Sequence, residues 1–182
     1  MKQKGLLLLI TLSILGVLSG IKGYSQEAFI KYTVNGKAYS FKGDKSGCYQ
    51  KKGNRDEEDK VDFLETSMYV DSKVKTDEKL GIVIRTAQGK KIETGDYTIQ
   101  SLVDQTEILP NVNLRIDREI KGELEFFGTV SPSNGVFKIT KVDGVWIEGT
   151  FEAELPSDFE DGNAPLKVTN GSFRVRLKGY MK

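Results

Sequence analysis

The stretch that decides the fold is Ala28–Lys42, which reads AFIKYTVNGKAYSFK. Apolar and polar residues alternate on both sides of Asn35-Gly36, a dipeptide that favours a type I′ turn because both of its residues accept positive φ. A two-residue turn at this point would place the large apolar side chains on one face: Ile30, Tyr32, Val34, Tyr39 and Phe41. The turn and the hydrophobic pattern agree, so the sequence predicts a β-hairpin.

Similar short runs continue to the C-terminus, separated by turn-forming residues. They predict strands over 61–70, 80–86, 97–100, 112–117, 123–130, 135–140, 145–155 and 167–177. Gly149 and Gly171 interrupt the last two strands, which indicates bulges or close backbone approaches. Residues 43–60 are mostly polar and charged and predict a mobile loop without a core-forming face. The expected class is all-β and antiparallel, either a β-sandwich, which we favour, or a calycin-like β-barrel.

The N-terminal segment has the pattern of a cleavable signal peptide. Two lysines precede an almost wholly apolar run over residues 5–21, and Gly23-Tyr24-Ser25 supplies small residues at the two positions that signal peptidase reads. We expect residues 1–25 to be removed between Ser25 and Gln26, leaving a single β domain over residues 26–182. An uncleaved anchor is the weaker alternative, because this run barely spans the roughly 30 Å of a hydrocarbon core.

A lipid anchor is not expected. The stretch Leu18-Ser19-Gly20-Ile21 matches the start of a bacterial lipoprotein signal, but isoleucine stands where the lipid-bearing cysteine would be. No diacylglycerol thioether can form without a thiol at that position. The protein is therefore predicted to be released by signal-peptide cleavage and to be secreted or periplasmic.

The domain left after cleavage is nearly neutral. Of 27 basic residues, Lys2, Lys4 and Lys22 are removed, which leaves 24 against 26 acidic residues and a net charge of −2. This balance lacks the basic footprint of a nucleic-acid-binding protein. Cys48 is the sole cysteine, so no intrachain disulfide can form and the fold must rest on its core. We expect a monomer, with an intermolecular Cys48 disulfide as a minor route to a dimer.

The sequence offers little chemistry for catalysis. It contains no histidine, which removes histidine-activated nucleophiles, histidine general bases and the usual zinc sites, and leaves Cys48 without an activating base. Glycoside hydrolysis needs only two carboxylates in a cleft, and the glutamates considered for it all lie on predicted strands: Glu123, Glu125, Glu148, Glu152 and Glu154. Alternating acidic and apolar residues are also typical of a solvated strand face. We favour that interpretation and predict no catalytic residue.

Two further features bear on binding. The loop over 156–165 carries oxygen ligands of the kind that calcium prefers, but their spacing does not fit an EF-hand; they are Asp158, Glu160, Asp161 and Asn163. We expect a solvated loop and no metal or cofactor. Trp146 shares its alternation parity with Glu148, so it should lie on the polar face of its strand, where it hints at a binding surface.

Motifs in the C-terminal third follow one another in a recognisable order. They read Gly135-x-Phe137-x-Ile139, Ile147-x-Gly149-Thr150-Phe151-Glu152 and Val168-Thr169-Asn170-Gly171-x-Phe173, with Gly95-x-Tyr97-x-Ile99 upstream. This pattern resembles a family of secreted or lipid-anchored bacterial proteins of unknown function that is common in Bacteroidota. The similarity covers about half of the mature chain. It implies an envelope-exported β domain and brings no activity with it.

Taken together, these patterns predict an exported envelope or extracellular domain that binds a ligand or an envelope protein without catalysing a reaction. Two alternatives stay open. One is a carboxylate-dependent glycoside hydrolase, which requires two acids in a cleft. The other is a structural or assembly protein of the cell envelope, which a large apolar surface patch would mark.

Overall fold

The computed structural model describes residues 27–54, 62–101, 108–120, 122–131, 133–158 and 163–178. The predicted signal peptide and its cleavage site lie outside these residues. In the described part, the elements are β1 (Phe29–Val34), β2 (Lys37–Lys42), the 3-10 helix η2 (Gly43–Lys45), β3 (Ser46–Asn54), β4 (Asp62–Val70), β5 (Glu78–Ala87), β6 (Gly95–Ile99), β7 (Asn111–Ile120), β8 (Glu123–Gly128), β9 (Gly135–Asp143), β10 (Trp146–Leu155) and β11 (Leu166–Arg176).

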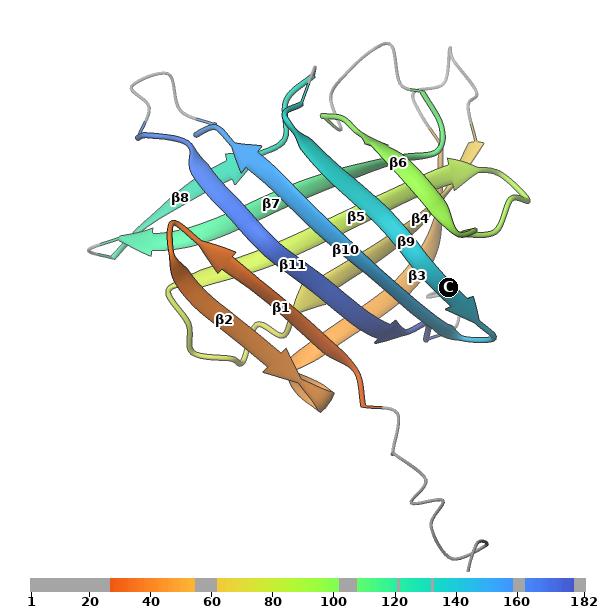
Figure 1. Ribbon diagram of the computed structural model, residues 1–182, viewed down its shortest axis with the longest axis horizontal. Helices are drawn as coiled ribbons and strands as arrows, with labels where there is room; N and C mark the ends of the chain where they lie inside the picture. The colour runs from red at the N-terminus through yellow and green to blue at the C-terminus, as the bar shows by residue number, and fades with distance from the viewer. Residues whose placement is uncertain are drawn as a thin grey trace, which may run out of the picture.

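The strands form one continuous sheet that curls into a nearly closed barrel (Figure 1). Its order is β2-β1-β11-β10-β9-β6-β7-β5-β4-β3, and β8 pairs with β7 outside this path. The all-β class, sandwich or barrel, is confirmed. The expectation of a purely antiparallel sheet needs one correction, because β6 and β7 run parallel where Thr98 pairs with Asn111 and Ile99 with Val112.

The two edges of the sheet, β2 and β3, follow each other directly in the chain through η2. Beyond this corner, β3 meets the end of β11 at one isolated parallel bridge between Tyr49 and Lys178. There the Lys178 N–H donates to the Cys48 carbonyl at 3.3 Å. We call this junction of β3 with the end of β11 the seam. The barrel is thus closed on this side by a chain connection and a single bridge instead of a full ladder.

The hairpin predicted at the start of the domain is confirmed in its register. Tyr32 pairs with Tyr39, and the turn residues Asn35 and Gly36 have φ of 46° and 88°. Strand β11 holds this turn in place. The Lys167 N–H donates to Asn35 Oδ1 at 2.9 Å, and the Asn35 N–H donates to the Lys167 carbonyl at 3.1 Å.

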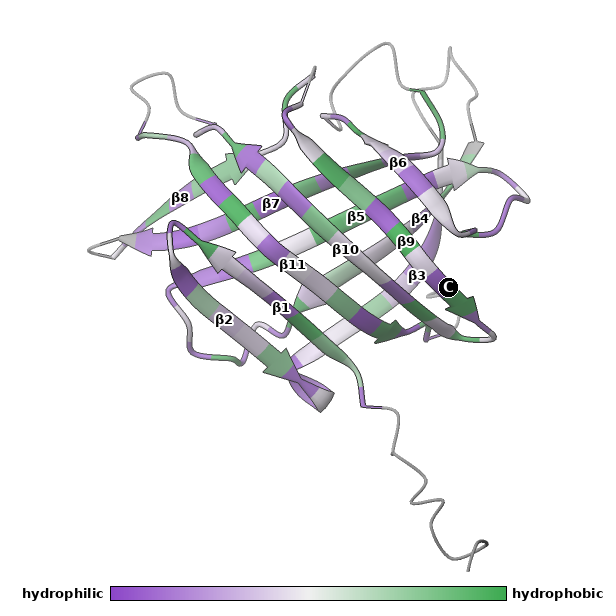
Figure 2. Ribbon diagram, in the orientation of Figure 1, coloured by the Kyte–Doolittle hydropathy of each residue, from purple (hydrophilic) through white to green (hydrophobic). Residues whose placement is uncertain are grey.

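Apolar side chains from both halves of the curled sheet form one buried cluster. Hydrophobic and hydrophilic residues alternate along β10, which sends every second side chain inward (Figure 2). In β11 the alternation shifts by one residue at Thr169-Asn170, and in β9 Phe137 and Ile139 face the core. Phe137, Phe151 and Phe173 stack on one another with ring centroids 5.6 to 6.3 Å apart. The described core is packed chiefly by aromatic and branched side chains.

Two glycines allow the sheet to curve, as expected from their positions. An added Cβ at Gly149 would lie 2.5 Å from the Lys138 carbonyl oxygen and 2.5 Å from the Phe173 ring. A Cβ at Gly171 would clash with the Phe151 backbone and ring. A register shift lies beside each glycine: β9 carries one extra residue, Thr140, opposite Gly149, and β11 carries one extra residue at Thr169-Asn170, directly before Gly171.

The prediction of a mobile polar loop over 43–60 is wrong for residues 43–54. Gly43–Lys45 is a 3-10 helix, and Ser46–Asn54 is β3, which pairs with β4 along its whole length. The segment reads as polar because its buried residues, Ser46, Gly47 and Cys48, are small or polar. As an edge strand it also carries Lys51 and Lys52, in keeping with the charged residues that blunt free sheet edges. Residues 55–60 lie outside the described part.

Candidate functional site

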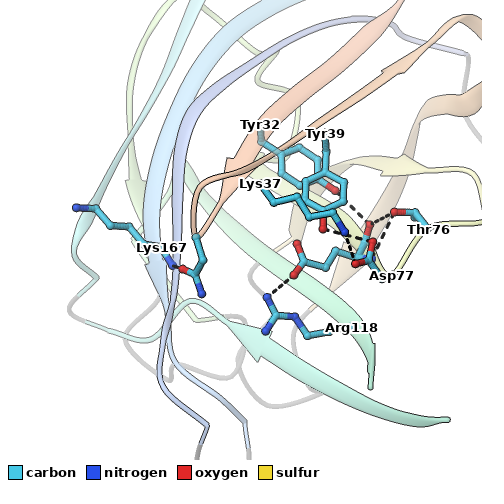
Figure 3. A network of polar contacts seen from close by, with 9 residues as sticks. Tyr32, Lys37, Tyr39, Thr76, Asp77, Arg118 and Lys167 are labelled. Atoms are coloured by element: carbon cyan, nitrogen blue, oxygen red, sulfur yellow. Dashed lines mark hydrogen bonds and ion pairs between the residues drawn. The ribbon is translucent and has the colours of Figure 1, made fainter. Parts of the chain in front are cut away.

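Polar side chains gather at the end of the barrel where the β1–β2 hairpin meets the start of β5 (Figure 3). Lys37 and Tyr39 both bind the Asp77 carboxylate, Tyr39 by donating to Oδ1 at 3.3 Å. The Tyr32 hydroxyl donates to the Glu78 carbonyl at 3.3 Å. Asp77, directly before β5, and Glu78, its first residue, therefore tie the hairpin to the rest of the barrel, and we call these contacts the end network.

Glu78 is the buried centre of the end network. Its side chain points into the barrel, where Oε1 binds Arg118, the residue directly opposite on β7. The Arg118 guanidinium lies 5.4 Å from the centre of the Phe127 ring. Glu78 Oε2 accepts no hydrogen bond within the described part of the chain. A single arginine thus carries the neutralisation of this carboxylate.

Burial decides the protonation of the two tyrosines. It raises the pKa of Tyr32 above the usual range, and, with the nearby Glu78 carboxylate, it raises the pKa of Tyr39 to about 12. Both hydroxyls are therefore neutral donors at ordinary pH. This arrangement suits a structural tie better than a nucleophile or general base.

A groove of about 300 Å³ lies along the seam. Four separate segments of the chain line it: the residues just before β1, η2 with the first residues of β3, the start of β10 and the end of β11. The less polar part of its wall comes from Ala28, Gly43, Gly47, Cys48, Trp146 and Val175. Charged residues line it as well, two acidic and two basic: Glu27, Asp44, Arg176 and Lys178. An apolar wall with a few polar groups is typical of small-ligand sites.

Trp146, the only tryptophan of the chain, lines this groove. It begins β10, and the next residue, Ile147, is fully buried, so the indole lies on the opposite face, as its parity predicts. The Arg174 guanidinium lies 5.1 Å from the centre of the indole ring, and Glu148 Oε1 is 3.5 Å from Arg174 Nε. A stacked cation, itself paired with a carboxylate, therefore holds the indole in the groove wall.

Cys48 also lines the groove but is only 2% exposed. Burial raises the pKa of its thiol to about 12. The thiol is protonated at neutral pH, so it is a poor nucleophile in the folded domain. This burial also leaves the sulfur little access to a second chain, which is what the disulfide-linked dimer would require.

The five glutamates considered for hydrolysis lie on two strands. Glu123 and Glu125 are on β8, whereas the other three lie on the outer face of β10. There Glu148 pairs with Arg174, and Glu152 Oε1 accepts the Asn170 N–H at 3.5 Å. Glu152 and Glu154 line one surface depression of about 230 Å³. The structure thus brings two of the five carboxylates to one depression.

The acidic loop is described only at its two ends. The Asp158 N–H donates to the Phe126 carbonyl at 2.8 Å, which docks the segment that follows β10 on β8. Glu160 and Asp161 lie outside the described residues. Within the described part, no three cysteine or carboxylate side chains form a group that could hold a metal ion. No described helix is long and apolar enough to cross a bilayer.

Two features escaped the sequence analysis. Glu78 precedes Leu80, Ile82 and Ile84 at the same parity, a signal that would have placed it inside the barrel. The groove had no such signal, because its walls come from residues between 27 and 178 that meet only once the barrel has formed.

No family model, curated protein or solved structure matches this chain. The resemblance to the Bacteroidota family therefore stays a prediction based on its motifs.

Proposed function

We propose that the protein is an exported, non-enzymatic binding domain that holds its ligand in the seam groove. The observation that carries this proposal is the position of Trp146 in the groove wall. A large aromatic ring with a partly polar surround is a common anchor for ligands, because it contributes apolar contact area at low conformational cost. Export is supported by the signal-peptide pattern of residues 1–25.

The chemistry around the groove supports binding over catalysis. Its one thiol, that of Cys48, is protonated because burial raises its pKa to about 12. The sequence holds no histidine to serve as a base. The other charged residues, Glu27, Asp44, Arg176 and Lys178, can orient a ligand by hydrogen bonds.

A second candidate, carboxylate-dependent hydrolysis, is favoured by one observation. Glu152 and Glu154 share a depression with Lys167. Residues two apart on a strand have Cα atoms about 6.6 Å apart, close to the roughly 6.5–9.5 Å between the carboxyl groups of inverting glycosidases. We rank this function second because both side chains are exposed on the convex face of the sheet. Hydrolysis of a polysaccharide that is lost in Glu152→Gln would favour it.

An assembly role has less support. The large hydrophobic side chains exposed in the described part are spread over several elements instead of forming one patch; they are Tyr69, Ile108, Leu124, Val130, Val136, Val142 and Val145. Scattered apolar residues are ordinary for a protein surface.

Ligand arrays of glycans and of envelope proteins, probed with the mature chain, test the proposed binding function. We expect a saturable ligand whose binding is lost in Trp146→Ala and kept in Leu124→Ala, a control on β8 that is 59% exposed and outside the groove. Because Trp146 is the only tryptophan, its fluorescence reports occupancy of the groove directly. Failure to bind either class of ligand, or binding that survives Trp146→Ala, would overturn the proposal.

A further inference from the structure

We infer that the ligand of the seam groove is a neutral oligosaccharide, which contacts Trp146 and continues onto a pair of tyrosines beside the groove. This inference rests on the proposed binding function and adds the chemical class of the ligand and a second contact surface. Three observations support it: the tyrosine pair, its position next to the groove, and the balance of charge around the groove.

The tyrosine pair lies on the outer face of β3 and β4. Tyr69 is 38% exposed, and its ring covers Gly47, where an added Cβ would clash with the ring. The missing side chain lets the aromatic ring lie against the bare backbone of β3. Tyr49 stands beside it, with ring centroids 5.8 Å apart and planes at 58°. The two rings form an aromatic surface on the solvent side of the sheet.

This surface adjoins the groove through two shared residues. Gly47 lies under the Tyr69 ring and also lines the groove. Tyr49 forms its backbone bridge with Lys178, which lines the groove as well. Trp146 contributes a ring from β10. A ligand that contacts Trp146 therefore needs only to extend past the seam to reach Tyr69.

The charge around the groove favours an uncharged, hydroxyl-rich ligand. Glu27 and Asp44 balance Arg176 and Lys178, so an anionic ligand would meet two carboxylates and a cationic one two basic groups. Sugar hydroxyls can both donate to the acids and accept from the bases. The C–H face of a pyranose ring also packs well on flat aromatic surfaces. These features favour a neutral saccharide over an acidic or basic peptide.

The test is a titration of the mature chain with neutral glucan, mannan and xylan oligomers of increasing length, followed by Trp146 fluorescence and by calorimetry. We expect at least one series to bind, with affinity that rises from monosaccharide to longer oligomers. Trp146→Ala should weaken binding of every length about thirtyfold or more, the loss expected of an aromatic hot spot. Tyr69→Ala should weaken only the longer oligomers, about tenfold.

Matched variants separate a lost contact from a damaged fold. Tyr69→Phe keeps the ring over Gly47 and should restore the binding of longer oligomers that Tyr69→Ala loses. Leu124→Ala, outside the groove, should bind like the parent chain. Tyr49→Ala removes the neighbouring ring and should also weaken longer oligomers selectively. Circular dichroism and a thermal melt of each variant identify any that fails to fold, and Tyr49→Ala then replaces Tyr69→Ala.

The outcomes distinguish this inference from the function on which it rests. Binding of a peptide, or of sulfated or carboxylated glycans in preference to neutral ones, would show that the ligand is not a neutral saccharide. If that binding is lost in Trp146→Ala, the groove would still be the binding site. An equal effect of Tyr69→Ala on short and long oligomers would overturn the second contact surface. Saccharide binding that is unchanged in Trp146→Ala would overturn the groove itself. No binding of any neutral oligomer would overturn the saccharide inference alone, and the proposed binding function fails only if the arrays of glycans and envelope proteins also show no ligand.

Discussion

Glu65 and Glu78 are buried to nearly the same extent, 7% and 5% exposed, but they face opposite sides of the sheet. Glu65 lies on the outer face, where groups on three strands approach its carboxylate: Lys51 Nζ at 3.0 Å, Ser67 Oγ at 3.2 Å and Arg85 Nε at 3.5 Å. Glu78 faces the interior and has Arg118 as its one charged partner in the described part.

The difference shows how position in a barrel limits the partners of a buried charge. On the outer face, long side chains from neighbouring strands can fold over a carboxylate and share its charge. Inside the barrel, the neighbours of Glu78 are mostly apolar core residues, so the cross-strand arginine has no substitute. We therefore expect the two regions to respond very differently to the loss of one cation.

The largest effect should follow from Arg118→Met. Removing one partner of a buried ion pair leaves an uncompensated charge, at a cost of about 3–5 kcal/mol. Urea denaturation at neutral pH measures this loss of unfolding free energy. The double variant Glu78→Leu with Arg118→Met should regain most of it, because an apolar pair of similar volume is often neutral or stabilising. A loss in the single variant too small to measure would contradict the view of Glu78 as dependent on one partner.

A smaller effect is expected for Arg85→Met in the outer cluster. Glu65 would keep Lys51 and Ser67, so the loss should be about 1.5–3 kcal/mol, the size of one charged hydrogen bond. The same urea titration gives the value. If Arg85→Met proves as costly as Arg118→Met, the contrast between the two faces of the sheet is wrong.

Alkaline pH should lower the stability of the domain through the buried tyrosines and Cys48, and not through the outer cluster around Glu65. Folding raises the pKa values of Tyr39 and Cys48 to about 12 and raises that of Tyr32 as well. Their stabilisation is complete below the unfolded pKa values, about 8.5 for cysteine and about 10 for tyrosine. It is lost as pH rises toward the folded values, because the unfolded chain releases its protons first.

Urea midpoints measured at increasing pH should therefore fall above about pH 9. Tyr39→Phe should flatten this decline, whereas Ser67→Ala in the outer cluster should leave its slope unchanged. A decline of the same slope in Tyr39→Phe and in the parent chain would show that Tyr39 does not cause it.

The smallest effect is expected for Lys37→Met, at the exposed edge of the end network. The side chains of Lys37 and Asp77 are 59% and 52% exposed, and exposed ion pairs contribute little to stability. The pair holds the pKa of Asp77 below its usual range, so its contribution exists at neutral pH and fades as the pH falls through that lowered value. Thermal melts of the Lys37→Met variant and of the parent chain at neutral pH should nearly coincide. A loss as large as that in Arg85→Met would show that this pair belongs to the buried network.

The sequence predicted the elements that are determined by residues close together in the chain. The Asn35-Gly36 turn fixed the register of the first hairpin, and strict alternation marked β10. It missed β3 because an edge strand with small buried residues lacks a hydrophobic pattern. It placed Trp146 on the polar face but could not reveal the groove around it, since the seam depends on how β3 meets the end of β11.

The pairing of β1 with β11 has a consequence for when this domain can fold. The hydrogen bond from Lys167 to Asn35 joins residues 132 positions apart, and β1 finds its second neighbour only in the last strand. Contacts of such long range make folding slow, because chain entropy is lost before the contacts compensate for it. The sheet cannot be completed until the C-terminal strand has been synthesised. A chain that stays unfolded until then can still be translocated across a membrane in an extended form, and the export predicted from residues 1–25 requires this.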